Sequence, residues 1–128
     1  MGEIQSFRDL EAWQKAMDLS VLVYSASNQL PSDERFGLTS QVRRASVSVP
    51  ANIAEGQSCG EDGRYIHHLR IALGSLGELS TEFDLARRLT FVGAAEAERV
   101  QQQIGRTRQI VCGLLRSLVR RRRAAPLR

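Results

Sequence analysis

Residues 63–89 read GRYIHHLRIALGSLGELSTEFDLARRL and contain no proline. Their apolar positions recur at spacings of three, four and seven residues: Ile66, Leu69, Leu73, Leu76, Phe83 and Ala86. This spacing places the side chains on one face of an α-helix and is typical of helices that pack in bundles. The stretch therefore predicts a helix over 63–89 and an all-α fold.

Three other segments have the same period, and each predicts a further helix. In residues 7–29 the apolar positions are Phe7, Leu10, Trp13, Met17, Val21 and Tyr24, and Ser6 is placed to cap this helix, with Asp9 three residues later. In residues 33–55 they are Leu38, Val42, Ala45, Val49 and Ile53. In residues 94–122 they are Ala97, Val100, Ile104, Thr107, Val111, Leu114 and Leu118.

The breaks between these segments are short, so consecutive helices are expected to be antiparallel neighbours. Pro31 ends the first segment, and Gly56 is expected to stop the second. We predict a single domain over residues 1–128, an antiparallel up-down-up-down four-helix bundle. Residues 124–128 are expected to form a disordered tail.

Composition narrows the class of protein. The chain has 128 residues, 42% of them hydrophobic, enough for a core without metal or disulfide. Cys59 and Cys112 have no ligand spacing, and no stretch reaches the roughly 18 apolar residues of a membrane span. We expect a cytoplasmic protein with no metal, no cofactor and no membrane partner.

Charge is distributed unevenly along the chain. Residues 1–98 carry nine basic and fourteen acidic side chains, whereas residues 99–128 carry nine arginines and no acid. The densest cluster comprises Arg116, Arg120, Arg121, Arg122 and Arg123. It exceeds what a helix dipole needs and predicts contacts with phosphate, although an acidic protein partner remains the alternative.

A second apolar stripe begins in residues 7–29 and ends just past them: Ala12, Ala16, Leu19, Val23, Ala26 and Leu30. A helix of a monomeric four-helix bundle needs only one broad apolar face. We therefore predict that Ala12, Ala16, Leu19 and Val23 form a subunit interface, the alternative being a helix deeply buried within a monomer.

Pro50 lies inside the predicted helix 33–55 and opposes the carbonyl of Ser46. Ser46, Ser48 and Asn52 are expected to repair that defect. Asn52 and Glu55 are expected to join Ser75 and Glu78 in a buried network, with Gly74 allowing close helix approach. The network either fixes helix register or forms a site for a ligand or catalysis.

Two pairs of adjacent side chains are candidates for a metal site or a nucleic-acid contact. His67 and His68 are adjacent and therefore cannot ligate one metal ion as an i, i+4 pair. Arg43 and Arg44 are also adjacent, and one of them is expected to pair with Glu55 or Glu78. Their other expected role is in binding nucleic acid.

Three segments closely resemble the 23S rRNA intervening-sequence protein family: FRDLEAWQKAM (7–17), LPSDERFGLTSQVRRASVSVPANIAEG (30–56) and LRIALGSLGEL (69–79). The resemblance spans residues 7 to about 89 and implies a small bacterial four-helix bundle. It places these residues on signature positions: Trp13, Gln14, Arg35, Gln41, Arg43, Arg44, Pro50, Asn52, Glu55, Gly56, Gly74, Ser75 and Glu78. The family is also similar to accessory proteins of diversity-generating retroelements, which implies a ring-like homo-oligomer, a pentamer.

Residues and resemblance together predict a non-catalytic, oligomeric bundle. It binds RNA or DNA, or acts as an adaptor for a nucleic-acid enzyme, through arginine-rich surfaces that include Arg43, Arg44, Arg116 and Arg120–Arg123. The alternative is a protein-interaction scaffold that binds no nucleic acid. An enzyme acting at Asn52, Glu55 and Glu78 is the third hypothesis, and no small-molecule substrate is expected.

Overall fold

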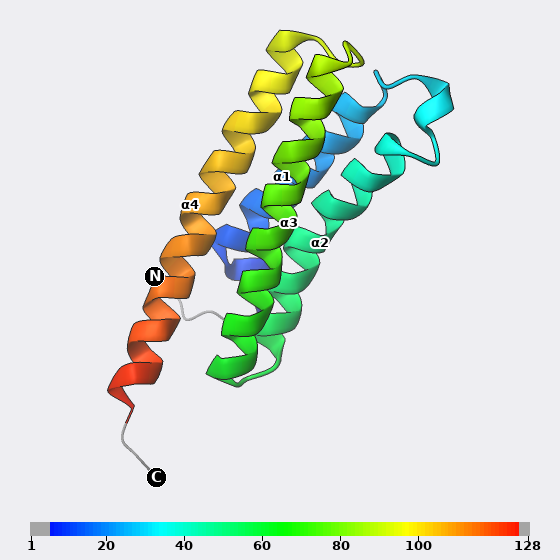
Figure 1. The fold of residues 1–128 in the computed structure, drawn as a ribbon. Helices are drawn as coiled ribbons and strands as arrows, with labels where there is room; N and C mark the ends of the chain where they lie inside the picture. Colours follow the sequence, from blue (N-terminus) through cyan, green and yellow to red (C-terminus); the bar gives the residue numbers. More distant parts are fainter. Residues whose placement is uncertain (1–5, 126–128) are drawn as a thin grey trace.

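In the computed structural model, which describes residues 6–125, four α-helices form an antiparallel bundle (Figure 1). They are α1 (Glu11–Ser27), α2 (Leu38–Ser58), α3 (Asp62–Arg88) and α4 (Ala94–Ala124), and the described residues include no strand. Each helix contacts the next, and α4 closes the bundle against α1. The predicted all-α, four-helix fold is confirmed.

No described helix combines the length and hydropathy that crossing a membrane requires.

The first predicted helix, 7–29, divides into two elements. The 3₁₀-helix η1 (Phe7–Asp9) comes first, and α1 begins only at Glu11. The predicted capping pair is confirmed: the Ser6 hydroxyl accepts from the Arg8 amide at 3.1 Å, and the Asp9 carboxylate accepts from the Ser6 amide at 3.2 Å. The pair caps η1 rather than α1, because Leu10 is extended (φ −76°, ψ 129°) and separates the two.

The start of the second predicted helix, 33–55, is also different. The 3₁₀-helix η2 (Ser32–Glu34) precedes α2, which begins at Leu38. The backbone of Gly37 is non-helical (φ −106°, ψ −113°) and ends the turn. The Glu34 carboxylate then accepts from the first α2 amide, that of Leu38, at 3.0 Å.

The prediction that Gly56 stops this helix is wrong, because α2 continues to Ser58 and the chain turns at Gly60, whose φ is +69°. Gly56 has a packing role: a Cβ there would lie 2.9 Å from Tyr65 Cδ1. The close approach predicted at Gly74 is wrong too, since a Cβ there meets nothing within 4 Å.

The other two helices match the prediction closely. The third was expected over 63–89 and spans Asp62–Arg88, while the fourth begins at residue 94 as predicted and ends at Ala124 instead of 122. Ala124 belongs to the predicted tail, but in the structure it is the last residue of α4. Residues 126–128 of the predicted tail lie outside the described residues.

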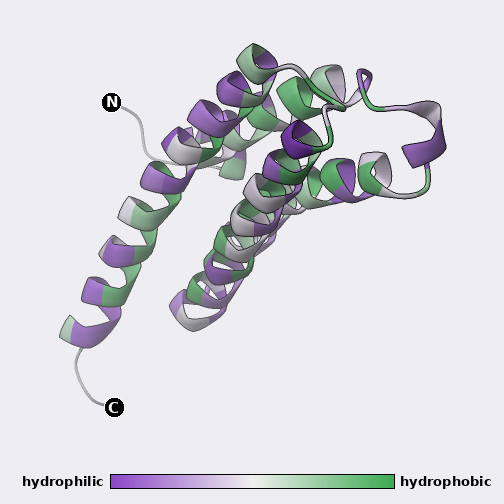
Figure 2. Ribbon diagram, turned by 45° about the horizontal axis from the view of Figure 1, so that its top comes forward, coloured by the Kyte–Doolittle hydropathy of each residue, from purple (hydrophilic) through white to green (hydrophobic). Residues whose placement is uncertain are grey.

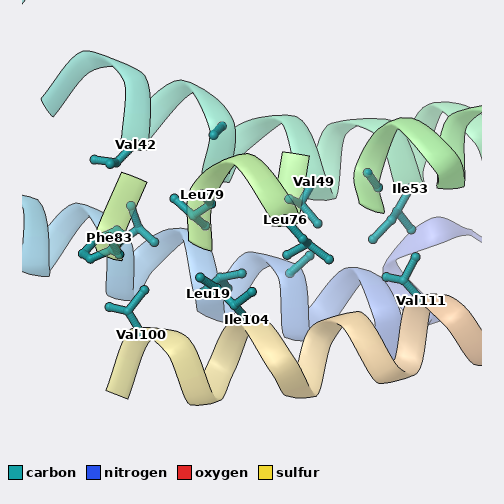
Figure 3. Packing of buried hydrophobic residues seen from close by; sticks show 14 of the residues in the cluster. Leu19, Val42, Val49, Ile53, Leu76, Leu79, Phe83, Val100, Ile104 and Val111 are labelled. Carbon is teal, nitrogen blue, oxygen red and sulfur yellow. The ribbon is translucent and has the colours of Figure 1, made fainter. Parts of the chain in front are cut away.

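The core is built from all four helices (Figure 3), whose apolar faces turn inward (Figure 2). The α1 face that reaches it is the one predicted to form a subunit interface: Ala12, Ala16, Leu19 and Val23 are at most 3% exposed within a single chain. That interface prediction is therefore wrong. The small alanines let α1 approach its neighbours closely. Of the expected core stripe, Leu10 is buried and Phe7 and Trp13 pack against the core, whereas Met17, Val21 and Tyr24 face outward and are 40%, 69% and 45% exposed.

The helices differ in length, which exposes one end of α4. At 1.5 Å per residue, the 17 residues of α1 span about 25 Å and the 31 residues of α4 about 46 Å. The last turns of α4 therefore extend past α1, beside the first turns of α3 (Figure 1). Most of the arginine cluster lies on these turns.

Candidate nucleic-acid interface

The last turns of α4 present three arginines on one face. Arg116, Arg120 and Arg123 follow each other at spacings of four and three, so they share a side of the helix, and all are exposed. Arg70, from α3, lies with them around a hollow of about 340 Å³ whose apolar lining residues are Leu115 and Val119. We call Arg70, Arg116, Arg120 and Arg123 the α4 arginine surface.

Within residues 6–125, the α4 arginine surface has no anionic partner. No acidic side chain lines the hollow. Among residues 6–125, no ion pair or hydrogen bond engages these four guanidinium groups. Four like charges around a shallow depression raise the local positive potential, which attracts anions. Leu115 and Val119 offer apolar surface on which arginine stems can lie while the guanidinium groups reach water.

The other two arginines of the cluster have structural contacts. Arg121 makes a bidentate contact with Asp62, from Nε at 2.9 Å and from Nη2 at 2.6 Å. The hydrogen bond from Arg121 lowers the pKa of Asp62. The Arg122 guanidinium lies against Gly63, where a Cβ would come within 2.8 Å of Nη1. Both side chains attach α4 to the start of α3, so the predicted phosphate-binding set divides into two groups.

Arg43 and Arg44 do not make the predicted ion pairs. The Arg43 Nε donates to Ser27 Oγ at 2.8 Å and its Nη2 to Asn28 Oδ1 at 3.0 Å. Arg44 Nη2 donates to Ser40 Oγ at 3.3 Å. No carboxylate pairs with either arginine in the part of the chain that the structure describes. Glu55 lies about 18 Å along the same helix from Arg43, beyond the reach of a side-chain contact.

A polar network joins α2 to α3, as predicted in part. The Asn52 amide nitrogen donates to the Ser48 carbonyl at 2.8 Å and approaches Ser48 Oγ at 3.1 Å. Ser48 Oγ lies 2.8 Å from Ser75 Oγ. Asn52 Oδ1 is 3.0 Å from His68 Nδ1, which must be the donor because an amide oxygen only accepts.

The two glutamates predicted for this network lie apart. Glu55 is mostly exposed, and its Oε1 is 3.9 Å from His68 Nε2. Glu78 lines a hollow of about 200 Å³ together with Ser48 and Ser75 of the network and with Gln41 and Arg44. The network connects α2 to α3, and among the described residues no hydrogen bond links Glu55 or Glu78 to it.

Burial affects a carboxyl that the sequence analysis did not single out. Glu82 is 6% exposed, and its Oε1 has no hydrogen-bond partner among the described residues. Burial raises the pKa of Glu82 to about 7, and the neighbouring carboxyl of Glu78 adds to the effect. The signal available in the sequence was the one-turn spacing of the two glutamates.

The remaining signature residues are dispersed. Trp13 packs edge-on against Phe7, with ring centroids 5.4 Å apart, and Gln14 donates to the Arg8 carbonyl at 2.9 Å. Arg35 lies at the α1–α2 connection, over the ring of Phe36. Over residues 6–125, no group of three or more potential metal ligands occurs, and both cysteines are free.

Sequence reasoning missed two residues that the fold brings to arginine-rich surfaces. Arg70 belongs to a different helix from the C-terminal arginines, and nothing in the linear sequence links them. Phe36 is 89% exposed. Its position in the polar stretch PSDERFG was the signal that could have identified it.

Comparison with known proteins gives two findings. The family model described as 23S rRNA-intervening sequence protein matches residues 8–113. A crystal structure from Bacteroides thetaiotaomicron, of a protein of unknown function from the S23 ribosomal protein family, superposes with a TM-score of 0.76 at 19% identity. The superposition covers 82% of this chain and 95% of that one. No curated protein matches.

Proposed function

The chain belongs to the 23S rRNA-intervening sequence protein family, and from that premise we propose that it is a non-catalytic protein that binds nucleic acid, with RNA as its first target. The α4 arginine surface makes the contacts. A cytoplasmic location follows from such a target. An adaptor role toward a nucleic-acid enzyme is compatible with the same surface.

One observation carries the proposal: four arginines from two helices surround a hollow of about 340 Å³, and no carboxylate of the described part of the chain lines it. If α4 only needed cations to complement its dipole, one or two would suffice. Arg121 and Arg122 already occupy the last turn of the helix. The α4 arginine surface is therefore in excess of the structural need.

The chemistry of these contacts defines what they can recognise. Guanidinium groups on an exposed helix face bind phosphate oxygens, and such contacts position a nucleic acid without reading its sequence. We expect similar affinity for duplexes of different sequence, because specificity needs contacts to base edges.

Fluorescence anisotropy with a labelled RNA duplex tests the proposal. Replacing Arg116, Arg120 and Arg123 with Gln should weaken binding strongly while leaving the helical content unchanged, since all three side chains are exposed. The matched pair of single variants is Arg120→Gln and Arg121→Gln: each removes one charge at adjacent positions, but Arg121 is already paired with Asp62. Equal losses in both variants would favour a general charge effect over the proposed surface.

A second observation favours self-association. Met17, Val21 and Tyr24 lie on one face of α1 and are 40%, 69% and 45% exposed. Clustered exposed apolar side chains are typical of interaction surfaces. We propose that a second copy of this chain covers Met17 and Val21 on this face, while Tyr24, whose ring contacts Arg43, remains accessible. This contact takes the place of the interface predicted at Ala12, Ala16, Leu19 and Val23. A ring-like pentamer is the assembly that the family resemblance suggests.

We propose no reaction for the polar network at Asn52. Its hydroxyl, amide and imidazole groups bond to one another. This pattern supports a role in helix register, and neither a small-molecule substrate nor a cofactor is part of the proposal.

A further inference from the structure

A second cluster of arginines lies at the end of the bundle opposite the last turns of α4, where α1 connects to α2 (Figure 1). Two hollows, of about 280 and 440 Å³, share Arg35, Thr39 and Arg43. The larger one is also lined by Tyr24, Phe36 and Arg44. We call Tyr24, Arg35, Phe36, Arg43 and Arg44 the loop cluster.

The loop cluster combines exposed aromatic rings with cations. Phe36 is 89% exposed and Tyr24 is 45% exposed. The Arg35 guanidinium lies 5.2 Å from the centroid of the Phe36 ring, and that of Arg43 lies 4.9 Å from the centroid of the Tyr24 ring. Exposing a phenylalanine ring to water is unfavourable, so a ring displayed in this way suggests a ligand.

The backbone holds Phe36 in place. It lies between η2 and α2, in a turn closed by a hydrogen bond from the Gly37 amide to the Glu34 carbonyl at 2.9 Å. Arg43 is fixed by its bonds to Ser27 and Asn28. The backbone position of Phe36 and the Arg43 guanidinium are therefore set before any ligand arrives, which lowers the entropy lost on binding.

No carboxylate of the described residues lines the two hollows of the loop cluster. Neither Asp33 nor Glu34, the two acids of this connection, lines either hollow. One carboxylate oxygen of Glu34 already accepts from the Leu38 amide. The remaining polar lining consists of hydroxyl and amide side chains, which can donate to phosphate oxygens.

We infer that the loop cluster binds unpaired nucleotides of an RNA strand. One base stacks on Phe36, and the guanidinium groups of Arg35 and Arg44 contact the neighbouring phosphates. Aromatic rings interleaved with cations suit single strands because bases in a duplex have no free face for stacking. This inference rests on the proposed function, and it adds that the target has unpaired nucleotides.

The test uses the full chain and a fluorescein-labelled oligouridylate of about ten nucleotides, whose bases stack weakly on one another and are free to stack on protein. Phe36→Ala should weaken its binding by roughly 5- to 150-fold, the equivalent of one lost stacked base. The affinity for the RNA duplex should not change. Phe36→Trp should retain oligouridylate binding, whereas Phe36→Leu, which keeps apolar area and loses the aromatic face, should behave like Phe36→Ala.

The outcomes separate this inference from the proposed function. If the duplex binds through the α4 arginine surface but oligouridylate affinity is unaffected by Phe36→Ala, the loop cluster is not a stacking site. A change in oligomer mass in Phe36→Ala, with unaltered RNA binding, assigns the ring to a protein contact and overturns the inference. If neither RNA binds to the wild type, the proposed function fails as well.

Discussion

The hydroxyl of Ser20 on α1 lies 2.9 Å from the carbonyl oxygen of Ser46 on α2. Pro50 has no amide hydrogen, so it cannot donate to this carbonyl as a residue in that place of a helix normally does. Ser46 is fully buried, and its carbonyl would otherwise be left unpaired. A side chain of the neighbouring helix therefore repairs the backbone of α2, which stays helical through Pro50.

Removing the Ser20 hydroxyl should destabilise the fold. We expect Ser20→Ala to reduce the free energy of unfolding by about 1–3 kcal/mol, the usual penalty for leaving a buried polar group unpaired. In a Pro50→Ala background residue 50 regains an amide, so the same substitution should cost less than half as much. Urea denaturation of the four proteins in this double-mutant cycle measures both values. An equal cost in the two backgrounds would show that Ser20 does not compensate for Pro50.

Gly56 and Gly74 should respond oppositely to alanine. A Cβ at Gly56 would lie 2.9 Å from Tyr65 Cδ1 and 3.3 Å from the Tyr65 backbone, so Gly56→Ala should force α2 and α3 apart and destabilise by about 1–3 kcal/mol. Gly74 is exposed in mid-helix with open space around it, so Gly74→Ala should stabilise by about 0.5–1 kcal/mol. Thermal unfolding of both variants provides the comparison. Two changes of the same sign would be inconsistent with this packing.

Glu82 should make stability depend on pH. Its pKa in the folded protein is about 7, above its ordinary value of 4.5, so the folded state holds this proton more tightly than the unfolded chain does. The contribution to stability is therefore full below pH 4.5, declines as the pH rises toward 7 and is lost above it. The total change is on the order of 3 kcal/mol.

Glu82→Gln removes this titration. The variant should be more stable than the wild type at about pH 8 and close to it at about pH 5, because only the ionised carboxyl is unfavourable when buried. Urea denaturation at the two pH values measures the difference. Parallel pH profiles for the two proteins would mean that Glu82 is not held neutral.

The fold was predictable from the sequence because helix period and short breaks are local signals. The core stripes of α3 and α4 were correctly identified for the same reason. The orientation of α1 was not predictable, because two stripes of that helix are apolar and the pattern alone favours the stripe with larger side chains for the core. Close packing instead selected Ala12, Ala16 and Ala26, a choice that depends on how near the neighbouring helices lie.

The sequence predicted which residue type forms the candidate site, but it did not predict which arginines the site contains. The acid-free run of arginines indicated a surface for anions, but not which of them would be free. Arg121 is paired with a residue 59 positions away, and Arg70 joins the surface from another helix. Likewise, Ser20 reaches Ser46 across 26 positions. Such partners are set by the packing of helices and have no signature in the linear sequence.

Self-association should depend on the outer face of α1. Val21→Arg places a charge on a residue that is 69% exposed in the single chain, so it should lower the mass measured by light scattering while the free energy of unfolding of the subunit changes little. Leu19→Arg is the contrasting variant, because it buries a charge in the core and should unfold the subunit. An unchanged mass for Val21→Arg, or a wild type that is monomeric, would exclude this face as the interface.

The salt dependence of RNA duplex binding tests the central claim most directly. Each phosphate contact on a duplex contributes about 0.9 to the slope of log affinity against log salt concentration. Replacing Arg116, Arg120 and Arg123 with Gln should therefore make the slope shallower by roughly 2.7 if each makes one contact. Arg121→Gln should leave it nearly unchanged, because Arg121 is paired with Asp62. The same slope for the triple variant and the wild type, or no binding by the wild type, would contradict the account.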